Sequence, residues 1–169
     1  MRILAIDPGF GRLGIAIIDK KNGNKATFVK NYGALMEELV FSMCFKTDKK
    51  KTLNERVFLI GQKIESIIKK YKPKALAIEK LFFTTNQKTA MAVSEARGVV
   101  LYEATKTKLP IYEYTPLEIK MAITGYGKAD KGQIMRMLPK LIKFSSTKTS
   151  DDELDAMAIG LTCFAIERF

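Results

Sequence analysis

The chain has 169 residues, 47% of them hydrophobic, which is enough for one folded domain with its own core over residues 1–169. Lysine and arginine outnumber aspartate and glutamate by 29 to 18, a formal charge of +11. A domain this basic usually binds a polyanion. Nucleic acid is therefore the first expectation, and an acidic membrane or the ribosome is the second.

Several classes of protein are excluded by composition. No run approaches 18 uncharged apolar residues, so we expect a cytoplasmic protein with neither a signal peptide nor a membrane span. Histidine is absent, which removes histidine-dependent triads and histidine-bound zinc. Cys44 and Cys163 have no second cysteine at ligand spacing and are expected to be core thiols. Any chemistry must use carboxylates, lysines, hydroxyls or a bound metal.

The first predicted element is an N-terminal β-hairpin. An apolar run over residues 3–6 stops at Asp7, a Pro/Gly turn follows, and residues 14–18 run back. This pattern places Asp7 at the carboxyl end of the first strand. An ordinary turn aspartate is the alternative, because Asp before Pro-Gly is common turn chemistry.

A third antiparallel strand is predicted from about residue 25 to residue 33. Residues 34–45 fit either a continued strand or a short helix, and residues 46–51 are predicted to form a solvated basic loop. A helix then begins after Thr52, where Thr52 and Glu55 form a capping box. Pro73 ends it.

The remainder alternates between strands and helices. Residues 74–79 form an apolar run that is typical of a strand buried on both faces. The other predicted elements are helices near 87–106, 116–123, 130–143 and 151–169 and a strand at 110–114. Three antiparallel strands followed by this alternation predict an α/β fold with a five-stranded mixed sheet, flanked by helices.

Two carboxylates are predicted to end neighbouring strands. Glu79 ends the 74–79 strand as Asp7 ends the first. If the two strands are parallel neighbours, both side chains lie at the carboxyl edge of the sheet, where open α/β sheets place their sites. A surface glutamate beside Lys80 is the alternative.

The last predicted helix supplies two more carboxylates. Ser150 and Glu153 form a capping box, and acids in a first turn suit the helix dipole. Asp155 is different, because it borders the apolar face and has no cation three or four residues away. Asp152 and Asp155, at i and i+3, can point at one spot.

A divalent metal is the predicted partner of these four carboxylates. Placed around one spot they repel one another, and some would be protonated without a cation. Mg²⁺ prefers such oxygen ligands. Two ions about 4 Å apart can activate a water and stabilise the leaving oxygen of a phosphodiester, and Mn²⁺ could replace Mg²⁺.

Four motifs occur in one order along nearly the whole chain: Ile6-Asp7-Pro8-Gly9 with Gly14, Ala77-Ile78-Glu79, Ala96-Arg97-Gly98, and Asp152-x-x-Asp155-Ala156-x-Ala158. This combination resembles the RuvC family of bacterial Holliday junction resolvases, which have an RNase H-like fold. The resemblance implies a Mg²⁺-dependent, structure-selective endonuclease that resolves four-way DNA junctions in recombination and repair by paired symmetric nicks. It assigns catalysis and metal binding to the four acids, Asp7, Glu79, Asp152 and Asp155.

The resemblance also implies DNA contacts and partners. Lys120 and Lys131 match family lysines near the scissile phosphate, where charge stabilises the transition state. Phe82 matches an aromatic that reaches the junction centre, while Phe83 is expected in the core. A homodimer would supply two symmetric sites. The RuvA–RuvB branch-migration complex is the expected partner in a cell. Residues 34–52 are longer than the family pattern there.

Three alternative functions fit the sequence less well. RuvX-like nucleases that process ribosomal RNA share the Asp-x-Gly hairpin, but the loop after Glu79 and the Ala-Arg-Gly helix favour RuvC. A non-catalytic junction-binding module would gain nothing from four acids beside a phosphate. A sugar or acyl kinase of the actin-like fold needs a second nucleotide-binding domain, for which 169 residues leave no room.

Overall fold

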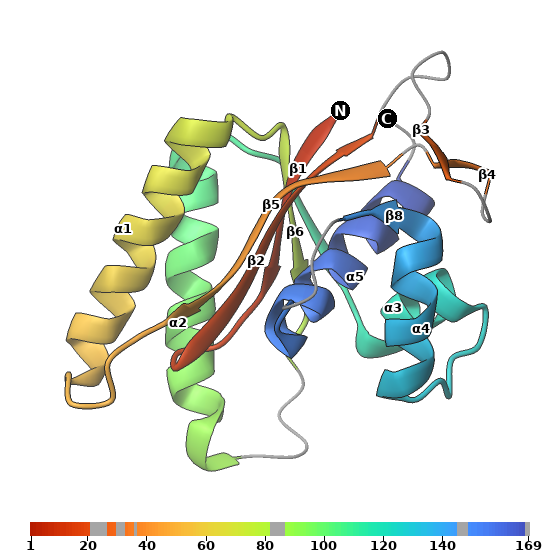
Figure 1. Cartoon of the computed structure of the whole chain (residues 1–169). Coiled ribbons are helices and arrows are strands. Elements are labelled where there is room, and N and C mark those ends of the chain that lie inside the picture. The colour runs from red at the N-terminus through yellow and green to blue at the C-terminus, as the bar shows by residue number, and fades with distance from the viewer. Residues whose placement is uncertain (21–26, 30–32, 36, 82–86, 145–148, 168–169) are drawn as a thin grey trace.

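A computed structural model describes residues 1–20, 27–29, 33–35, 37–81, 87–144 and 149–167 (Figure 1). Its centre is a six-stranded mixed sheet with strand order β7-β6-β1-β2-β5-β8. These strands are β1 (Arg2–Asp7), β2 (Arg12–Lys20), β5 (Glu37–Lys46), β6 (Ala75–Glu79), β7 (Ile111–Tyr114) and β8 (Ile142–Lys143). A separate two-stranded sheet pairs β3 (Thr27–Val29) with β4 (Gly33–Leu35). The predicted α/β class and the antiparallel-then-parallel order are confirmed.

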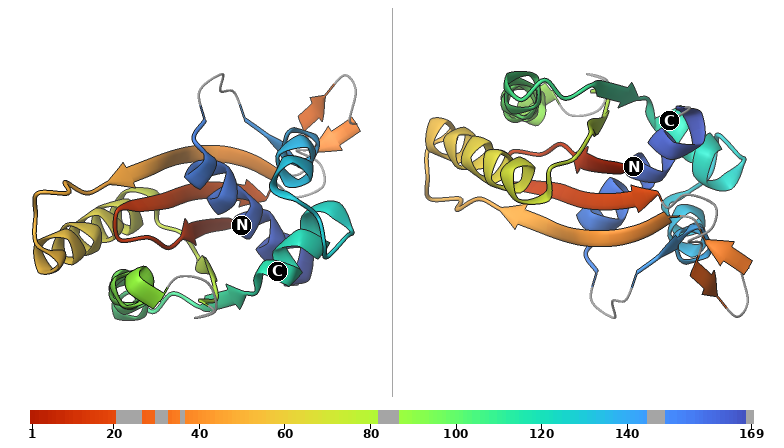
Figure 2. Two further views of the ribbon diagram at one scale, coloured as in Figure 1. Left: turned by 90° about the horizontal axis from the view of Figure 1, so that it is seen from below. Right: turned by 90° about the horizontal axis from the view of Figure 1, so that it is seen from above.

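Two layers of helices cover the central sheet. They are α1 (Leu53–Tyr71), α2 (Gln87–Lys106), α3 (Pro116–Thr124), α4 (Lys131–Leu141) and α5 (Asp151–Ile166). Figures 1 and 2 show α1 and α2 on one face, and α5 with α3 and α4 on the other. None of the helices within the described ranges is long and apolar enough to cross a membrane.

Strand β1 contributes to the core on both faces of the sheet. Ile3 and Ala5 pack in the cluster that contains α5, whereas Leu4 and Ile6 pack in the cluster that contains α1 and α2. All four side chains are fully buried, as the two-residue period of a strand requires between two covered faces. A charged group fits only at the end of such a strand, which is where Asp7 lies.

The predicted position of the third antiparallel strand, residues 25–33, is wrong for the central sheet. The strand that pairs with β2 is β5, and all of it except Lys46 lies within residues 34–45, which sequence patterns left open between strand and helix. All nine residues of β2, from Arg12 to Lys20, pair antiparallel with the ten-residue β5, and the extra residue is taken up by a register shift between Ile17 and Ile18. Within residues 25–33, the structure describes β3 and the first residue of β4, which pair with each other.

Two other boundaries differ from the prediction. The helix predicted over 130–143 ends at Leu141, and Ile142–Lys143 forms β8, parallel to β5. Ile142 is buried in the core, so its β-branched side chain is better served by an extended backbone than by another helical turn. The sheet therefore has six strands rather than five. The last helix ends at Ile166 rather than residue 169.

The predicted start of α1 is confirmed. The Thr52 hydroxyl accepts a hydrogen bond from the Glu55 amide, and the Glu55 carboxylate accepts one from the Thr52 amide. Lys72, with φ 48°, forms the C-cap immediately before Pro73. Because both ends are fixed, β6 begins at a defined place beside β1.

The N-terminus of α5 lies directly on the β1–β2 hairpin. A Cβ atom added to Gly14 would lie 2.1 Å from the backbone oxygen of Asp152 and 3.0 Å from Cβ of Asp7. Gly160 makes a similar approach farther along the helix, where an added Cβ would lie 2.6 Å from Ile18 Cδ1. Any side chain at residue 14 would push α5 away from the hairpin.

We expect Gly14→Ala to lower the stability of the protein by about 3 kcal/mol, because its methyl group would meet backbone and not a movable side chain. Thermal unfolding should show a Tm lower by roughly 10 °C. Gly98→Ala is the control, since an added Cβ there meets nothing within 4 Å of it in the described structure. That helical substitution should raise stability by up to about 1 kcal/mol. Equal Tm values for the two variants would contradict the packing argument.

Candidate active site

Asp7 and Glu79 lie side by side at the carboxyl edge of the sheet. Strands β1 and β6 are parallel neighbours, and Ile6 pairs with Ile78, so the next residue of each strand is a carboxylate. The predicted adjacency of these two strands is confirmed. Because the preceding residues of both strands are fully buried, both carboxylates are held by rigid parts of the core.

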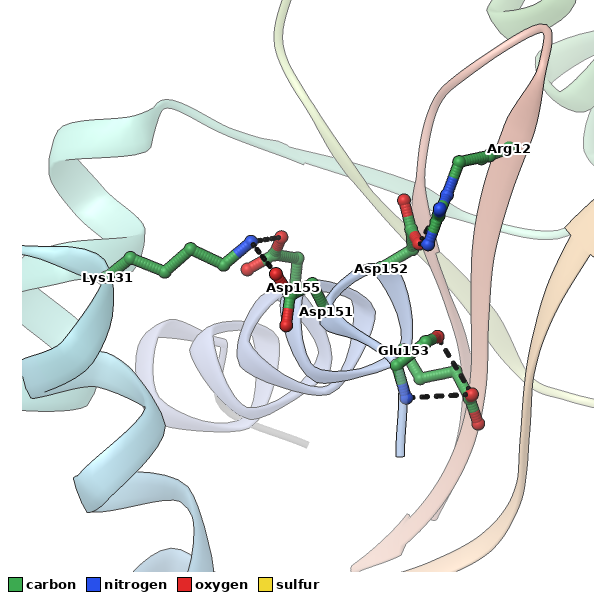
Figure 3. Close-up of polar contacts among 7 residues, drawn as sticks. Arg12, Lys131, Asp151, Asp152, Glu153 and Asp155 are labelled. Carbon is green, nitrogen blue, oxygen red and sulfur yellow. Dashed lines mark hydrogen bonds and ion pairs between the residues drawn. The ribbon is translucent and has the colours of Figure 1, made fainter. Parts of the chain in front are cut away.

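Helix α5 brings its two carboxylates to the same edge. Its first turns pack against β1 and β2, with Asp152 next to Gly14. Asp155 lines a cleft of about 300 Å³ together with Asp7, Glu79, Lys120 and Lys131. Asp152 does not line this cleft and is turned toward Arg12 of the hairpin (Figure 3). Five of the seven predicted site residues therefore share one cleft, the sixth, Asp152, lies close enough for its charge to act on Asp7, and the seventh, Phe82, lies outside the described residues.

Burial and mutual repulsion raise the pKa of three of the carboxyl groups. Burial, followed by the charges of Asp155, Glu79 and Asp152, raises the pKa of Asp7 to about 7. Burial and the Asp155 charge also raise the pKa of Glu79. Burial raises the pKa of Asp155 although Lys131 opposes it. These groups are stable together only with protons or cations.

Arg12 holds Asp152 and was missed by sequence reasoning. Its Nε donates to Asp152 Oδ2 at 2.9 Å, and its Nη2 donates to the same oxygen (Figure 3). Burial raises the pKa of Asp152, but hydrogen bonds from Arg12 and Cys44 outweigh it and leave that pKa below its usual value. The sequence does show an arginine in the turn after Asp7, but nothing local links it to Asp152, which lies 140 residues away in the sequence.

Lys131 is the second basic residue at the site. Its Nζ lies 3.1 Å from Asp155 Oδ2 and 3.3 Å from Asp151 Oδ2 (Figure 3). The neighbouring acid Glu153 points elsewhere, because its carboxylate accepts hydrogen bonds from the amide and hydroxyl of Ser150 and from the hydroxyl of Ser42. The capping role predicted for Glu153 is confirmed, whereas Asp151 is also an ion-pair partner.

Arg97 fixes the end of β6 from the side of α2. Its Nε donates to the backbone oxygen of Glu79 at 3.3 Å, and its Nη2 pairs with Glu113 on β7. The guanidinium thus ties the last residue of β6 to the neighbouring strand. This contact gives a structural reason for the arginine in the Ala96-Arg97-Gly98 motif.

The donor set fits a hard divalent cation by its chemistry. All four predicted ligands are carboxylates, and Asp7, Glu79 and Asp155 carry raised pKa values that a cation would lower. In the described part of the chain, no group of three His, Cys, Asp or Glu side chains has metal-binding geometry. Asp152 and Asp155 are instead engaged by Arg12 and Lys131. Phe82 and Phe83 lie outside the described residues.

Comparisons with a family model and with related sequences both lead to the same protein family. The family model described as crossover junction endodeoxyribonuclease RuvC matches residues 3–163. The RuvC protein of Petrotoga mobilis is 45% identical over 158 residues, which cover 94% of this chain and 90% of that protein.

Solved structures agree in fold. The chain superposes on Thermus thermophilus RuvC with a TM-score of 0.84 and 27% identity, covering 98% of this chain and 94% of that one. For T. thermophilus RuvC in complex with a Holliday junction substrate, the TM-score is 0.82 at 28% identity, with coverage of 96% and 92%.

The raised pKa of Asp7 predicts how stability changes with pH. Since folding favours the protonated form, the contribution is complete below the unfolded value of 3.8 and is lost as pH rises through about 7. In metal-free protein, we expect this group to lower the free energy of unfolding by about 2 to 3 kcal/mol between pH 5 and pH 8. Asp7→Asn should remove that fall, as measured by denaturant unfolding in EDTA. An identical pH dependence in both proteins would show that Asp7 titrates normally.

Proposed function

Because the chain belongs to the RuvC family of crossover junction endodeoxyribonucleases, we propose that it resolves four-way DNA junctions by hydrolysing phosphodiester bonds. Family membership confirms the resemblance and the enzyme class predicted from the sequence. The observation that carries the proposal is one cleft that joins Asp7, Glu79 and Asp155 to Lys120 and Lys131. Paired symmetric nicks, in recombination and repair, are the proposed outcome.

We propose that each active site binds two Mg²⁺ ions and that Mn²⁺ can replace them. Asp7, Glu79, Asp152 and Asp155 are the proposed ligands and catalytic residues. Bound ions would activate the attacking water and stabilise the leaving oxygen. To take this role, Asp152 and Asp155 would exchange Arg12 and Lys131 for the metal.

The strand acids and the lysines of the cleft have different proposed roles. Asp7 and Glu79 are held by buried strands, so they orient the site without reorganisation. Lys120 and Lys131 would bind phosphate oxygens and stabilise the charge that develops in the transition state. Lys131 would be free for this once Asp155 has turned to the metal.

Assembly and junction contacts complete the proposal. A homodimer would provide two symmetric cleavage sites, and a monomer in light scattering at micromolar concentration would contradict it.

Phe82 is proposed to stack on an unpaired base at the junction centre. Phe82→Ala should weaken junction cleavage and leave the fold intact, whereas normal cleavage would contradict this role. In a cell, the RuvA–RuvB complex is the proposed partner.

Cleavage of a labelled four-way junction, with and without Mg²⁺ and beside a linear duplex, tests the function. We expect paired symmetric nicks in the junction alone and only with metal. Asp7→Asn, Glu79→Gln, Asp152→Asn and Asp155→Asn should each reduce the rate about 1,000-fold, since each removes charge from the site. Glu153→Gln is the matched control: it lies on the same helix but contacts Ser42 and Ser150, and should cleave at the normal rate.

The other outcomes separate the alternatives. Tight junction binding without nicks under any divalent ion would leave a non-catalytic binding module. Activity on ribosomal RNA precursors instead of junctions would favour the RuvX-like alternative. Loss of cleavage in Glu153→Gln, equal to that of the four acid variants, would contradict the assignment of the site.

A further inference from the structure

An exposed apolar surface borders the cleft on the side of α3. Leu117 and Met121 lie one turn apart on this helix and are 60% and 49% exposed, and Tyr126 in the following loop is 54% exposed. Large apolar side chains at this exposure lose the benefit of burial, so a group of them beside a functional site indicates a ligand surface. We call these three residues the α3 patch.

The loop that carries Tyr126 is fixed by hydrogen bonds. The Thr124 hydroxyl accepts from the Tyr126 amide at 3.1 Å, and the Tyr126 carbonyl accepts from the Ala129 amide at 3.0 Å. Gly125, with φ 72°, closes α3 before it. The backbone of Tyr126 is therefore held at both its amide and its carbonyl, and its ring is presented to solvent from a defined position.

Gly127 brings this loop against α3. A Cβ atom added there would lie 2.5 Å from Leu117 Cδ1 and 3.5 Å from Met121 Sδ. The loop backbone next to Tyr126 thus rests on the two apolar side chains of the helix. This close approach holds the loop that carries Tyr126 against the helix that carries Leu117 and Met121.

The helix and the loop that carry the α3 patch also line the cleft, through Lys120 on α3 and through Ala129 and Asp130 in the loop, and Asp130 is engaged as the N-cap of α4. Lys120 lines the cleft and lies one turn from Leu117 and next to Met121. Lys128, in the same loop, is exposed. The acid on this helix, Glu118, is engaged in the capping box with Thr115. A polyanion bound in the cleft would therefore lie beside the helix and the loop that carry the α3 patch.

We propose that the α3 patch docks an unstacked nucleotide of the DNA strand beside the scissile phosphate, with the Tyr126 ring stacked on its base. This inference rests on the proposed nuclease function. An aromatic ring beside lysines is the usual arrangement for single-stranded nucleic acid, because bases stack while the backbone is neutralised. Three side chains are too few for a stable protein interface, which needs about 800 Å² from each partner.

Junction binding without metal and the fluorescence of 2-aminopurine placed beside the cut site test the proposal. Tyr126→Ala should weaken binding about tenfold and abolish the fluorescence change that wild-type protein causes, since base stacking is lost. Tyr126→Phe keeps the ring and should preserve both signals. Phe58→Ala is the matched control, because Phe58 on α1 is 64% exposed in the other helical layer. It should match wild type.

The outcomes distinguish this proposal from the function on which it rests. If the wild-type protein neither binds nor cleaves junctions, the proposed nuclease function itself is contradicted. Wild-type cleavage combined with unchanged binding and fluorescence in Tyr126→Ala would overturn the α3 patch alone. A Tyr126→Ala variant that lost self-association, with normal DNA binding and fluorescence, would identify a protein occupant and also overturn the proposal. Melting curves of both Tyr126 variants check that the fold is retained.

Discussion

The contact between Gly14 and the backbone of Asp152 fixes the geometry on which the site depends. At this point α5 touches the β1–β2 hairpin so closely that no side chain fits between them. The contact sets where the helix begins relative to Asp7. A second close approach at Gly160 holds the rest of the helix on β1 and β2. Two carboxylates on a helix and two on strands can then face one edge with little freedom.

Charge at this edge is distributed unevenly, and that imbalance explains why a cation suits it. The helix acids Asp152 and Asp155 are paired with Arg12 and Lys131. Asp7 and Glu79 form no salt bridge within the described residues, and burial raises the pKa of both. A bound cation would therefore stabilise the ionised forms of Asp7 and Glu79. The helix acids, in contrast, already have cationic partners within the protein.

The layer formed by α3, α4 and α5 unites the proposed functions of the molecule. It supplies the lysines of the cleft, the helix acids and the α3 patch, while β1 and β6 supply the buried carboxylates. Arg97 ties the end of β6 to β7 from the opposite layer. Elements from both helical layers and from the sheet therefore hold the residues of the cleft in place. Such rigidity suits a reaction that depends on preorganised charge.

Local pattern was sufficient to find the candidate acids. An apolar strand buried on both faces can carry a charge only at its end, and this constraint identifies Asp7 and Glu79. An acid beside the apolar face of a helix, with no cation in reach along that helix, identifies Asp155. The strands that carry Asp7 and Glu79, and the capping box of Glu153, also follow from contacts within a few residues, and the structure confirms them.

Long-range pairing decided the rest. Residues 25–33 and the segment containing β5 both had strand character, and only the tertiary structure shows that β5 is the strand that pairs with β2. The two-residue strand β8 exists because β5 lies beside it, so no local signal could predict it. Arg12 meets Asp152 across 140 residues, and Leu117 meets Gly127 through the packing of a loop on a helix. The sequence by itself determined which groups carry charge, and the tertiary structure alone decided which of them meet, because those contacts join segments with no local relation.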